Sequence, residues 1–283
     1  MAHFVLSSFA DEVSPYFDEQ LKALKEEGIS LIELRGINGK SASEMTAREA
    51  DEVKSKLDEA GIRLSSLGSP FGKAMLDVPF DNHLSSFLHG LEICKRLDFN
   101  RMRIFSFYPP KNDDPYSWRD EVYRRLSIIL DEAEKVGVFL VHEKEKAIYG
   151  DITERCDNIL KYFGTRMGFV FDPANFIQCG IKPLEAYDVL SPYITYMHIK
   201  DACAEDGSVV VSGHGDGDIG VILERINKDR MDEVILTIEP HLTIFDELNA
   251  LQKEDLAFRE IYPDRKTAFH AACAALKNII KSL

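Results

Sequence analysis

The stretch that decides the fold lies in the middle of the chain and reads Leu140-Val141-His142-Glu143-Lys144-Glu145-Lys146-Ala147-Ile148-Tyr149-Gly150-Asp151. An apolar run that begins at Val138 ends abruptly in a cluster of charged side chains, and a helical pattern follows from about residue 152. A buried strand that stops in a polar cluster before a helix is typical of parallel α/β proteins. Such proteins display their chemistry at the carboxyl ends of their strands.

Three later apolar runs end in the same way, in Asp172, His198 and Glu239. Together with Glu143 they offer three carboxylates and one imidazole. This oxygen-rich set suits manganese, magnesium or cobalt and is less typical of zinc. We therefore predict that the four side chains bind one divalent metal ion. The plainer alternative, that each ends a strand and pairs with a nearby lysine, weakens when four strands end in ligand-type residues.

A helix, a glycine and a strand recur along the chain at a spacing of roughly 35 residues, which indicates β/α units and a parallel sheet. Eight strands are predicted, over 3–7, 31–35, 63–67, 102–106, 138–142, 168–172, 195–199 and 234–238. Helices are predicted over 16–27, 45–60, 82–97, 116–136, 152–163, 183–190, 217–228 and 266–281. Eight units in 283 residues fit a closed (β/α)8 TIM barrel better than an open sheet. No linker divides the chain, so we expect one domain over residues 1–283, with an irregular loop and a short helix over 242–265.

Composition excludes several classes of function. The net charge is -14, from 34 basic and 48 acidic side chains, which argues against a nucleic-acid partner. No apolar run approaches the roughly 18 residues of a membrane span. The five cysteines are odd in number and lack a C-x-x-C spacing, so we expect no disulfide framework and a reducing, cytoplasmic location.

Four motifs carry a resemblance to a known family: residues 142–151 (HEKEKAIYGD), 171–180 (FDPANFIQCG), 197–201 (MHIKD) and 238–242 (IEPHL). With them, nearly the whole chain resembles the xylose-isomerase-like superfamily of TIM barrels, often labelled sugar phosphate isomerases or epimerases. The resemblance implies the same four metal ligands. It also implies that Glu143 and Glu239 act as base and acid on opposite faces of the substrate, as two ligand glutamates do in the epimerases of the superfamily. The motifs do not select a substrate.

The leading hypothesis is a metal-dependent isomerase or epimerase of a sugar or keto-sugar, acting by proton transfer through an enediolate. One alternative is a lyase on the same scaffold, either a dehydratase of a keto-cyclitol or an enzyme that cleaves a 3-keto-glycoside. An endonuclease for apurinic sites, from the same superfamily, would need three zinc ions and further histidines. Here asparagine stands at position 175, where such an enzyme has one of them. A sugar-binding protein without turnover would not need carboxylates on both faces.

Residues near the four strand ends are candidates for binding the substrate. They are Arg35, Lys146, Tyr149, Asn175, Lys200, His214 and His241. His142 is expected to point to the side of its strand opposite Glu143. The glycine-dense loop 212–219 could cradle an anion with its backbone N–H groups, or form a tight turn in which Asp218 caps the next helix. Asp201 could orient Lys200. By analogy with the superfamily we expect a homodimer or homotetramer and a small sugar as ligand.

Overall fold

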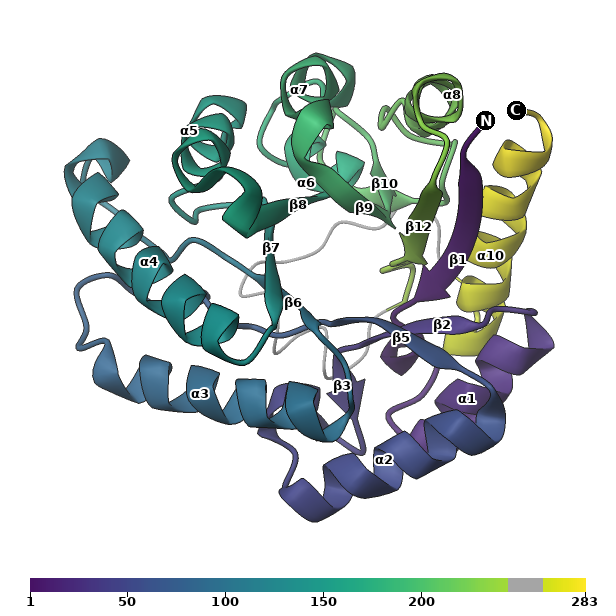
Figure 1. Cartoon of the computed structure of the whole chain (residues 1–283). Helices are drawn as coiled ribbons and strands as arrows, with labels where there is room; N and C mark the ends of the chain where they lie inside the picture. Colours follow the sequence, from purple (N-terminus) through teal and green to yellow (C-terminus); the bar gives the residue numbers. More distant parts are fainter. Residues whose placement is uncertain (244–261) are drawn as a thin grey trace.

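Eight parallel strands form a nearly closed barrel surrounded by helices, in a computed structural model that describes residues 1–243 and 262–283 (Figure 1). The strands are β1 (His3–Ser8), β2 (Leu31–Leu34), β5 (Arg63–Leu67), β6 (Arg101–Ile104), β7 (Phe139–Glu143), β8 (Met167–Phe171), β9 (Ile194–Ile199) and β12 (Glu233–Ile238). The prediction of a single (β/α)8 barrel is confirmed. Most of the loop predicted over 242–265 lies outside the described residues.

The strands are hydrogen-bonded in the order β1-β12-β9-β8-β7-β6-β5-β2, and β1 lies beside β2 to complete the ring (Figure 1). Each predicted strand agrees with an observed one to within one or two residues. The shift matters for β7, which runs one residue further than predicted and includes Glu143. Because β12, β9, β8 and β7 are neighbours, the ends of these four strands lie next to one another.

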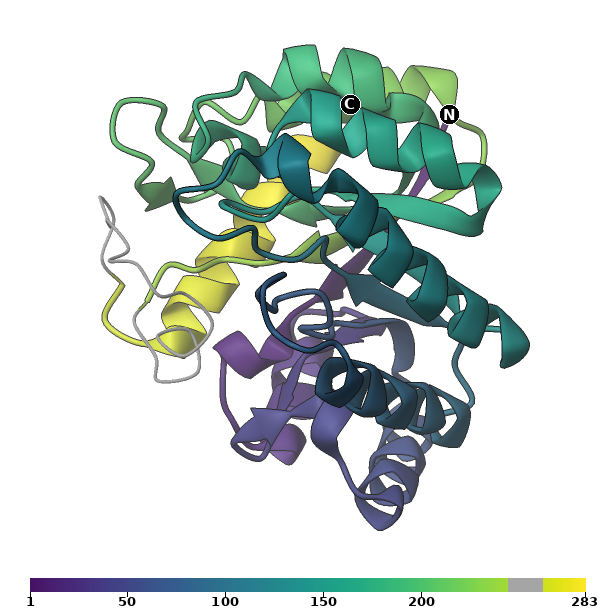
Figure 2. The ribbon, with the colours of Figure 1, turned by 90° about the vertical axis from the view of Figure 1, so that its left-hand side faces the viewer.

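The barrel is covered by amphipathic helices that follow its strands (Figures 1 and 2). They are α1 (Phe17–Glu26), α2 (Ala47–Ala60), α3 (Asp81–Arg96), α4 (Arg119–Lys135), α5 (Thr153–Phe163), α7 (Pro183–Leu190), α8 (Ile219–Asp229) and α10 (Arg265–Lys281). Local signals set their ends: Thr46 and Glu49 form a capping box for α2, and Gly61 ends it in the left-handed conformation. In the part of the chain that the structure describes, no helix combines the length and the apolar character that crossing a membrane requires.

Several short elements after the strands were not predicted. They are the hairpins β3 (Gly36–Ile37) with β4 (Lys40–Ser41) and β10 (Asp201–Ala202) with β11 (Val209–Val210), and the helix α6 (Pro173–Ile177). The described residues also form five 3-10 turns: η1 (Ala10–Glu12), η2 (Ala42–Glu44), η3 (Pro115–Trp118), η4 (Gly164–Arg166) and η5 (Ser191–Tyr193). Elements this short carry too few residues for a periodic pattern. The two hairpins and α6 nevertheless follow strands and lie at the mouth of the barrel.

Among the described residues the core has three clusters. A small inner cluster of Val141, Val170 and Tyr196 lies inside the barrel, and a large outer cluster packs between the strands and the helices. A third, small cluster joins α6 to β10. His142 alternates with Val141 and stacks on Phe169 of the outer cluster, as its position in the strand predicts. Burial lowers the pKa of His142 to about 4, so this side chain is a neutral packing group.

The loop after β5 is fastened to the segment after β6 by backbone hydrogen bonds through Gly72. Phe107 donates to the Gly72 carbonyl over 2.8 Å, and Phe105 donates to the Phe71 carbonyl over 2.7 Å. Gly72 has φ +91°, and a Cβ atom there would overlap the carbonyl oxygen of Phe105. This close approach fixes the positions of Lys73 and Phe105, which face the pocket described below.

Replacing Gly72 with alanine is therefore expected to destabilise the protein by several kcal/mol, about 3 or more, because backbone must move. Gly61 has a similar φ of +68° but open space around its Cβ position. Gly61→Ala is expected to cost about 1 kcal/mol, from the left-handed backbone alone. Urea denaturation of both variants measures the difference, and equal losses would contradict the steric argument.

His83 anchors the same loop and makes its stability depend on pH. The Gly72 N–H donates to His83 Nε2 over 3.1 Å, and burial, assisted by the charge of Arg125, lowers the pKa of His83 to about 4. The unfolded chain, with a histidine pKa near 6.5, therefore binds more protons between about pH 6.5 and pH 4. This contribution to stability is complete above pH 6.5 and is lost as the pH falls through that window.

The free energy of unfolding, followed from pH 7 to pH 4, is expected to fall less steeply in His83→Gln than in the native protein. The glutamine retains an acceptor for Gly72 but takes up no proton. The difference should approach about 1.4 kcal/mol per pH unit inside the window. His3→Gln, at an exposed position, serves as control. Identical slopes in the native protein and His83→Gln would remove His83 as a source of the pH dependence.

Candidate metal centre

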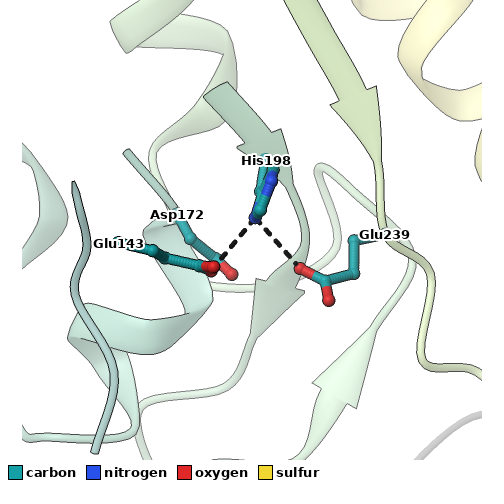
Figure 3. Close-up of side chains that lie close together, drawn as sticks. All are labelled: Glu143, Asp172, His198 and Glu239. Atoms are coloured by element: carbon teal, nitrogen blue, oxygen red, sulfur yellow. Dashed lines mark hydrogen bonds and ion pairs between the residues drawn. The ribbon is translucent and has the colours of Figure 1, made fainter. Parts of the chain in front are cut away.

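The four predicted ligands converge at the mouth of the barrel (Figure 3). Glu143 ends β7, Asp172 follows β8, His198 lies near the end of β9, and Glu239 follows β12. One ligand atom from each side chain lies within 4.8 Å of all the others, and all four residues are buried. Four neighbouring parallel strands thus bring residues far apart in sequence to one point, which sequence spacing alone could not establish.

His198 stands at the centre of this group. Its Nδ1 atom lies 3.0 Å from Glu143 Oε1 and 3.4 Å from Glu239 Oε2, so the two glutamates meet at this nitrogen, one to either side of it (Figure 3). Asp172 is held differently. One of its oxygens accepts from the N–H groups of Ala174 and Asn175 and thereby begins α6. Its other oxygen lies 2.8 Å from Lys200 Nζ.

The carboxylates are neutralised by cations of the chain itself. Arg103 Nη1 lies 3.1 Å from Glu143 Oε2, Arg35 Nη1 lies 2.9 Å from Glu239 Oε1, and Lys200 lies between Asp172 and Glu239. Burying a carboxylate without such partners would be prohibitively costly. The site is thus a closed network of opposite charges.

These charges shift the pKa values of the site. Burial alone would raise the pKa of Glu143, but His198 and Arg103 outweigh it and lower the value to about 2. Lys200 and His241 likewise lower the pKa of Glu239 well below its usual value, against its burial. Burial raises the pKa of Asp172 despite the opposing charge of Lys200. Both glutamates are therefore anions at neutral pH, the form in which a carboxylate binds a cation or accepts a proton.

A pocket with about 350 Å³ of empty space opens beside the group. It is lined by Arg35, Lys73, Arg103, Phe105, Glu143, Glu145, Asn175, Lys200, Glu239 and His241. Four of the seven predicted substrate-binding residues, Arg35, Asn175, Lys200 and His241, line this pocket.

The other three do not, so the structure gives no support for their predicted contact with substrate. Lys146 and His214 are exposed. Tyr149 is buried, and its ring packs edge-on against Tyr123 in the outer core. In the loop after β7, Glu145 faces the pocket instead, where it pairs with Lys73 over 2.6 Å. Spacing along an irregular loop does not predict which side chains turn inward.

The glycine-dense loop does cradle an anion, but that anion belongs to the chain. The N–H groups of Gly213, Gly215 and Gly217 donate to the Asp201 carboxylate over 2.8, 3.1 and 2.9 Å. Asp201 therefore fastens this loop. It does not orient Lys200, so that prediction is wrong. Asp218 precedes α8 but makes no side-chain capping hydrogen bond. The sequence predicted an anion cradle without identifying its occupant.

Sequence reasoning missed other parts of the site. Arg103 was detectable, because it is a charged residue inside an apolar strand, between Met102 and Ile104. Asp11 and Glu12 follow β1 and hold Arg35, with Arg35 Nε 2.8 Å from Asp11 Oδ2 and Arg35 Nη2 3.2 Å from Glu12 Oε1. Nothing in the local sequence distinguishes these two from surface acids.

Among the described residues, a second group could also hold a metal: Glu12, Glu239 and His241. His241 Nε2 lies 3.3 Å from Glu12 Oε1 and 3.2 Å from Glu239 Oε1. However, the Arg35 guanidinium already contacts these same two oxygens. The prediction of one ion rests on the first group, because it offers four ligand atoms where the second offers three.

Calorimetric titration with Mn²⁺ or Co²⁺ is therefore expected to find one ion per chain. Asp172→Asn should weaken binding by about 10-fold or more, since a ligand charge is lost. Asp188→Asn, which alters an exposed aspartate on α7, should bind as the native protein does. Three ions per chain, or unchanged affinity in Asp172→Asn, would contradict this assignment.

Comparisons with known proteins place the chain in a family. Solved structures similar to it over nearly their whole length include D-psicose 3-epimerase with D-tagatose from Clostridium cellulolyticum H10 (16% identity, TM-score 0.73, 99% of each chain). Others are the probable 3-DHS dehydratase AsbF of Bacillus anthracis (14%, 0.73, 98% of this chain and 99% of that one) and the IolI protein with a zinc atom (16%, 0.75, 100% and 99%). No curated protein matches the sequence. The family model for the xylose isomerase-like TIM barrel matches residues 21–261, and the chain belongs to that family.

Proposed function

We propose that the protein is a divalent-metal-dependent isomerase or epimerase of a sugar or keto-sugar that works by proton transfer through an enediolate. One observation carries the proposal. Glu143 and Glu239 lie to either side of His198 Nδ1, and both line the same pocket. Two carboxylates that line one pocket can exchange protons with both faces of a carbon atom bound between them.

The residues present fit the proposed ion. Three buried carboxylates and one imidazole form a donor set suited to manganese, magnesium or cobalt, with zinc as a further candidate. An ion held by Glu143, Asp172, His198 and Glu239 would polarise a substrate carbonyl and lower the energy of the enediolate. Among structural neighbours, the IolI protein carries zinc, and a xylose isomerase-like barrel from Mycobacterium smegmatis is in complex with magnesium.

Residues of the chain would transfer the protons, hold the two glutamates in place and bind the substrate oxygens. One glutamate removes the carbon-bound proton. The other, which is ionised in the free protein, takes a proton from solvent and delivers it on the opposite face. The Asn175 amide donates to Glu143 Oε1 over 3.2 Å, and Arg103 and Arg35 hold the outer oxygens of Glu143 and Glu239. These contacts fix both carboxylates in place. Lys200 and His241 line the pocket with N–H donors for substrate oxygens.

A lyase is the second candidate, and one feature favours it. His241 Nε2 lies between Glu12 and Glu239, and burial raises the pKa of Glu12. His241 and Glu12 together could donate a proton to the leaving oxygen of a substrate once the neighbouring carbon is deprotonated. Dehydration and cleavage of a 3-keto-glycoside both require such a proton. A probable 3-DHS dehydratase among the structural neighbours supports this candidate. We further propose a small sugar ligand and a cytoplasmic, oligomeric protein.

Keto-sugars with and without phosphate, incubated with the Mn²⁺-loaded protein in D₂O, test the proposal. Deuterium is expected at the carbon next to the carbonyl, with a rearranged sugar as product. Glu143→Gln and Glu239→Gln should each lower this exchange by about 10²–10⁴-fold, while Glu154→Gln, exposed on α5, should not change it. Loss of water or of an aglycone would identify the lyase.

Metal content of each variant separates two causes of inactivity. A glutamine variant that still binds one ion and no longer exchanges the proton has lost its base or acid. Full exchange after treatment with a chelator, or in either glutamine variant, would contradict the proposed mechanism.

A further inference from the structure

Glu33 is buried inside the barrel, at the nitrogen of His198 that faces away from Glu143 and Glu239. It lies in β2, is 1% exposed, and does not line the pocket. Both of its oxygens are nevertheless engaged. Oε2 lies 3.0 Å from His198 Nε2, and Oε1 accepts from the Tyr196 hydroxyl over 2.9 Å. A carboxylate taken fully out of water needs such partners, and here they are a predicted metal ligand and the residue two positions before it.

The two nitrogens of His198 have different surroundings. Nε2 faces Glu33, whereas Nδ1 faces Glu143 and Glu239, which are both predicted metal ligands. An ionised carboxylate can only accept hydrogen bonds, so each nitrogen can donate to one, Nε2 to Glu33 and Nδ1 to Glu143. A metal ion requires a neutral imidazole, which keeps only one proton, and the other predicted ligands lie on the Nδ1 side. We infer that Glu33 is a positioning residue that holds the proton of His198 on Nε2 and directs Nδ1 to the metal ion.

The ring of His198 is oriented by other contacts as well. Phe9 packs against it edge-on with ring centroids 4.9 Å apart, and Tyr196 does so at 5.5 Å. These aromatic contacts restrict the ring, but they do not decide which nitrogen is protonated. That choice depends on the hydrogen-bonding partner of Nε2, as for other metal-binding histidines. The contribution of Glu33 is therefore separable from packing.

Glu33→Gln tests the inference with little change of shape. The Tyr196 hydroxyl donates to position 33, so the glutamine oxygen is expected to turn toward Tyr196 and its NH₂ group toward His198. An amide donor at Nε2 favours the tautomer with the proton on Nδ1, which cannot bind the ion. Affinity for Mn²⁺ or Zn²⁺, measured by calorimetry, should fall about 10–100-fold. Tyr196→Phe leaves the carboxylate on His198 and should cause a smaller loss.

Two further measurements distinguish positioning from a general structural role. Val53→Ala, which removes packing on α2 away from the barrel mouth, should lower the unfolding temperature but leave metal affinity unchanged. Long-range ¹H–¹⁵N NMR of the native protein loaded with diamagnetic Zn²⁺ should show the proton of His198 on Nε2. A proton on Nδ1 there, or native affinity in Glu33→Gln, would overturn the inference.

This inference rests on the proposed metal centre but not on the proposed reaction. A native protein that binds no divalent ion would refute the metal centre itself. A protein that binds one ion with Nε2 protonated, yet turns over no keto-sugar, would support the role of Glu33 and refute the isomerase. The outcomes of the two tests are therefore distinguishable.

Discussion

The pairing of buried opposite charges at the mouth of the barrel is the constraint on which the rest of the site depends. Six buried acids, Asp11, Glu12, Glu33, Glu143, Asp172 and Glu239, meet three buried cations, Arg35, Arg103 and Lys200, together with His198 and His241. Removing one of the cations would leave a buried carboxylate without its partner, which is far more costly than the net gain from the pair. The network therefore fixes the geometry of its members.

The barrel makes this concentration of charge tolerable. Its strands place the charged groups at one end, above an apolar inner layer of Val141, Val170 and Tyr196, while the outer core packs separately against the helices. Gly72 and Asp201 then fasten two loops around the site, one through a close backbone approach and the other through a carboxylate wrapped by N–H groups. The scaffold can hold a rigid polar centre because its stability comes from the apolar clusters.

Much of this could be predicted from local patterns. The helix, glycine and strand repeat gives the order and number of units, and four apolar runs that end in ligand-type residues indicate the metal centre. Patterns fail where function depends on contacts between distant segments. The contact of Glu33 with His198, for example, joins residues 165 positions apart. Lys146 and Tyr149 were expected at the site, and the path of an irregular loop placed Glu145 there instead.

The sequence by itself determined the eight-unit barrel and the chemical types of the predicted ligands, because periodic burial and strand-end polarity are local properties of the chain. The tertiary structure decided which acids meet which cations. It paired Arg35 with Glu12 and Glu239, and filled the glycine-rich cradle with Asp201. It also set Glu33 against one nitrogen of His198 and the predicted ligands against the other. These choices arise from closure of the ring, which brings the first strands against the last, and no local pattern encodes that approach.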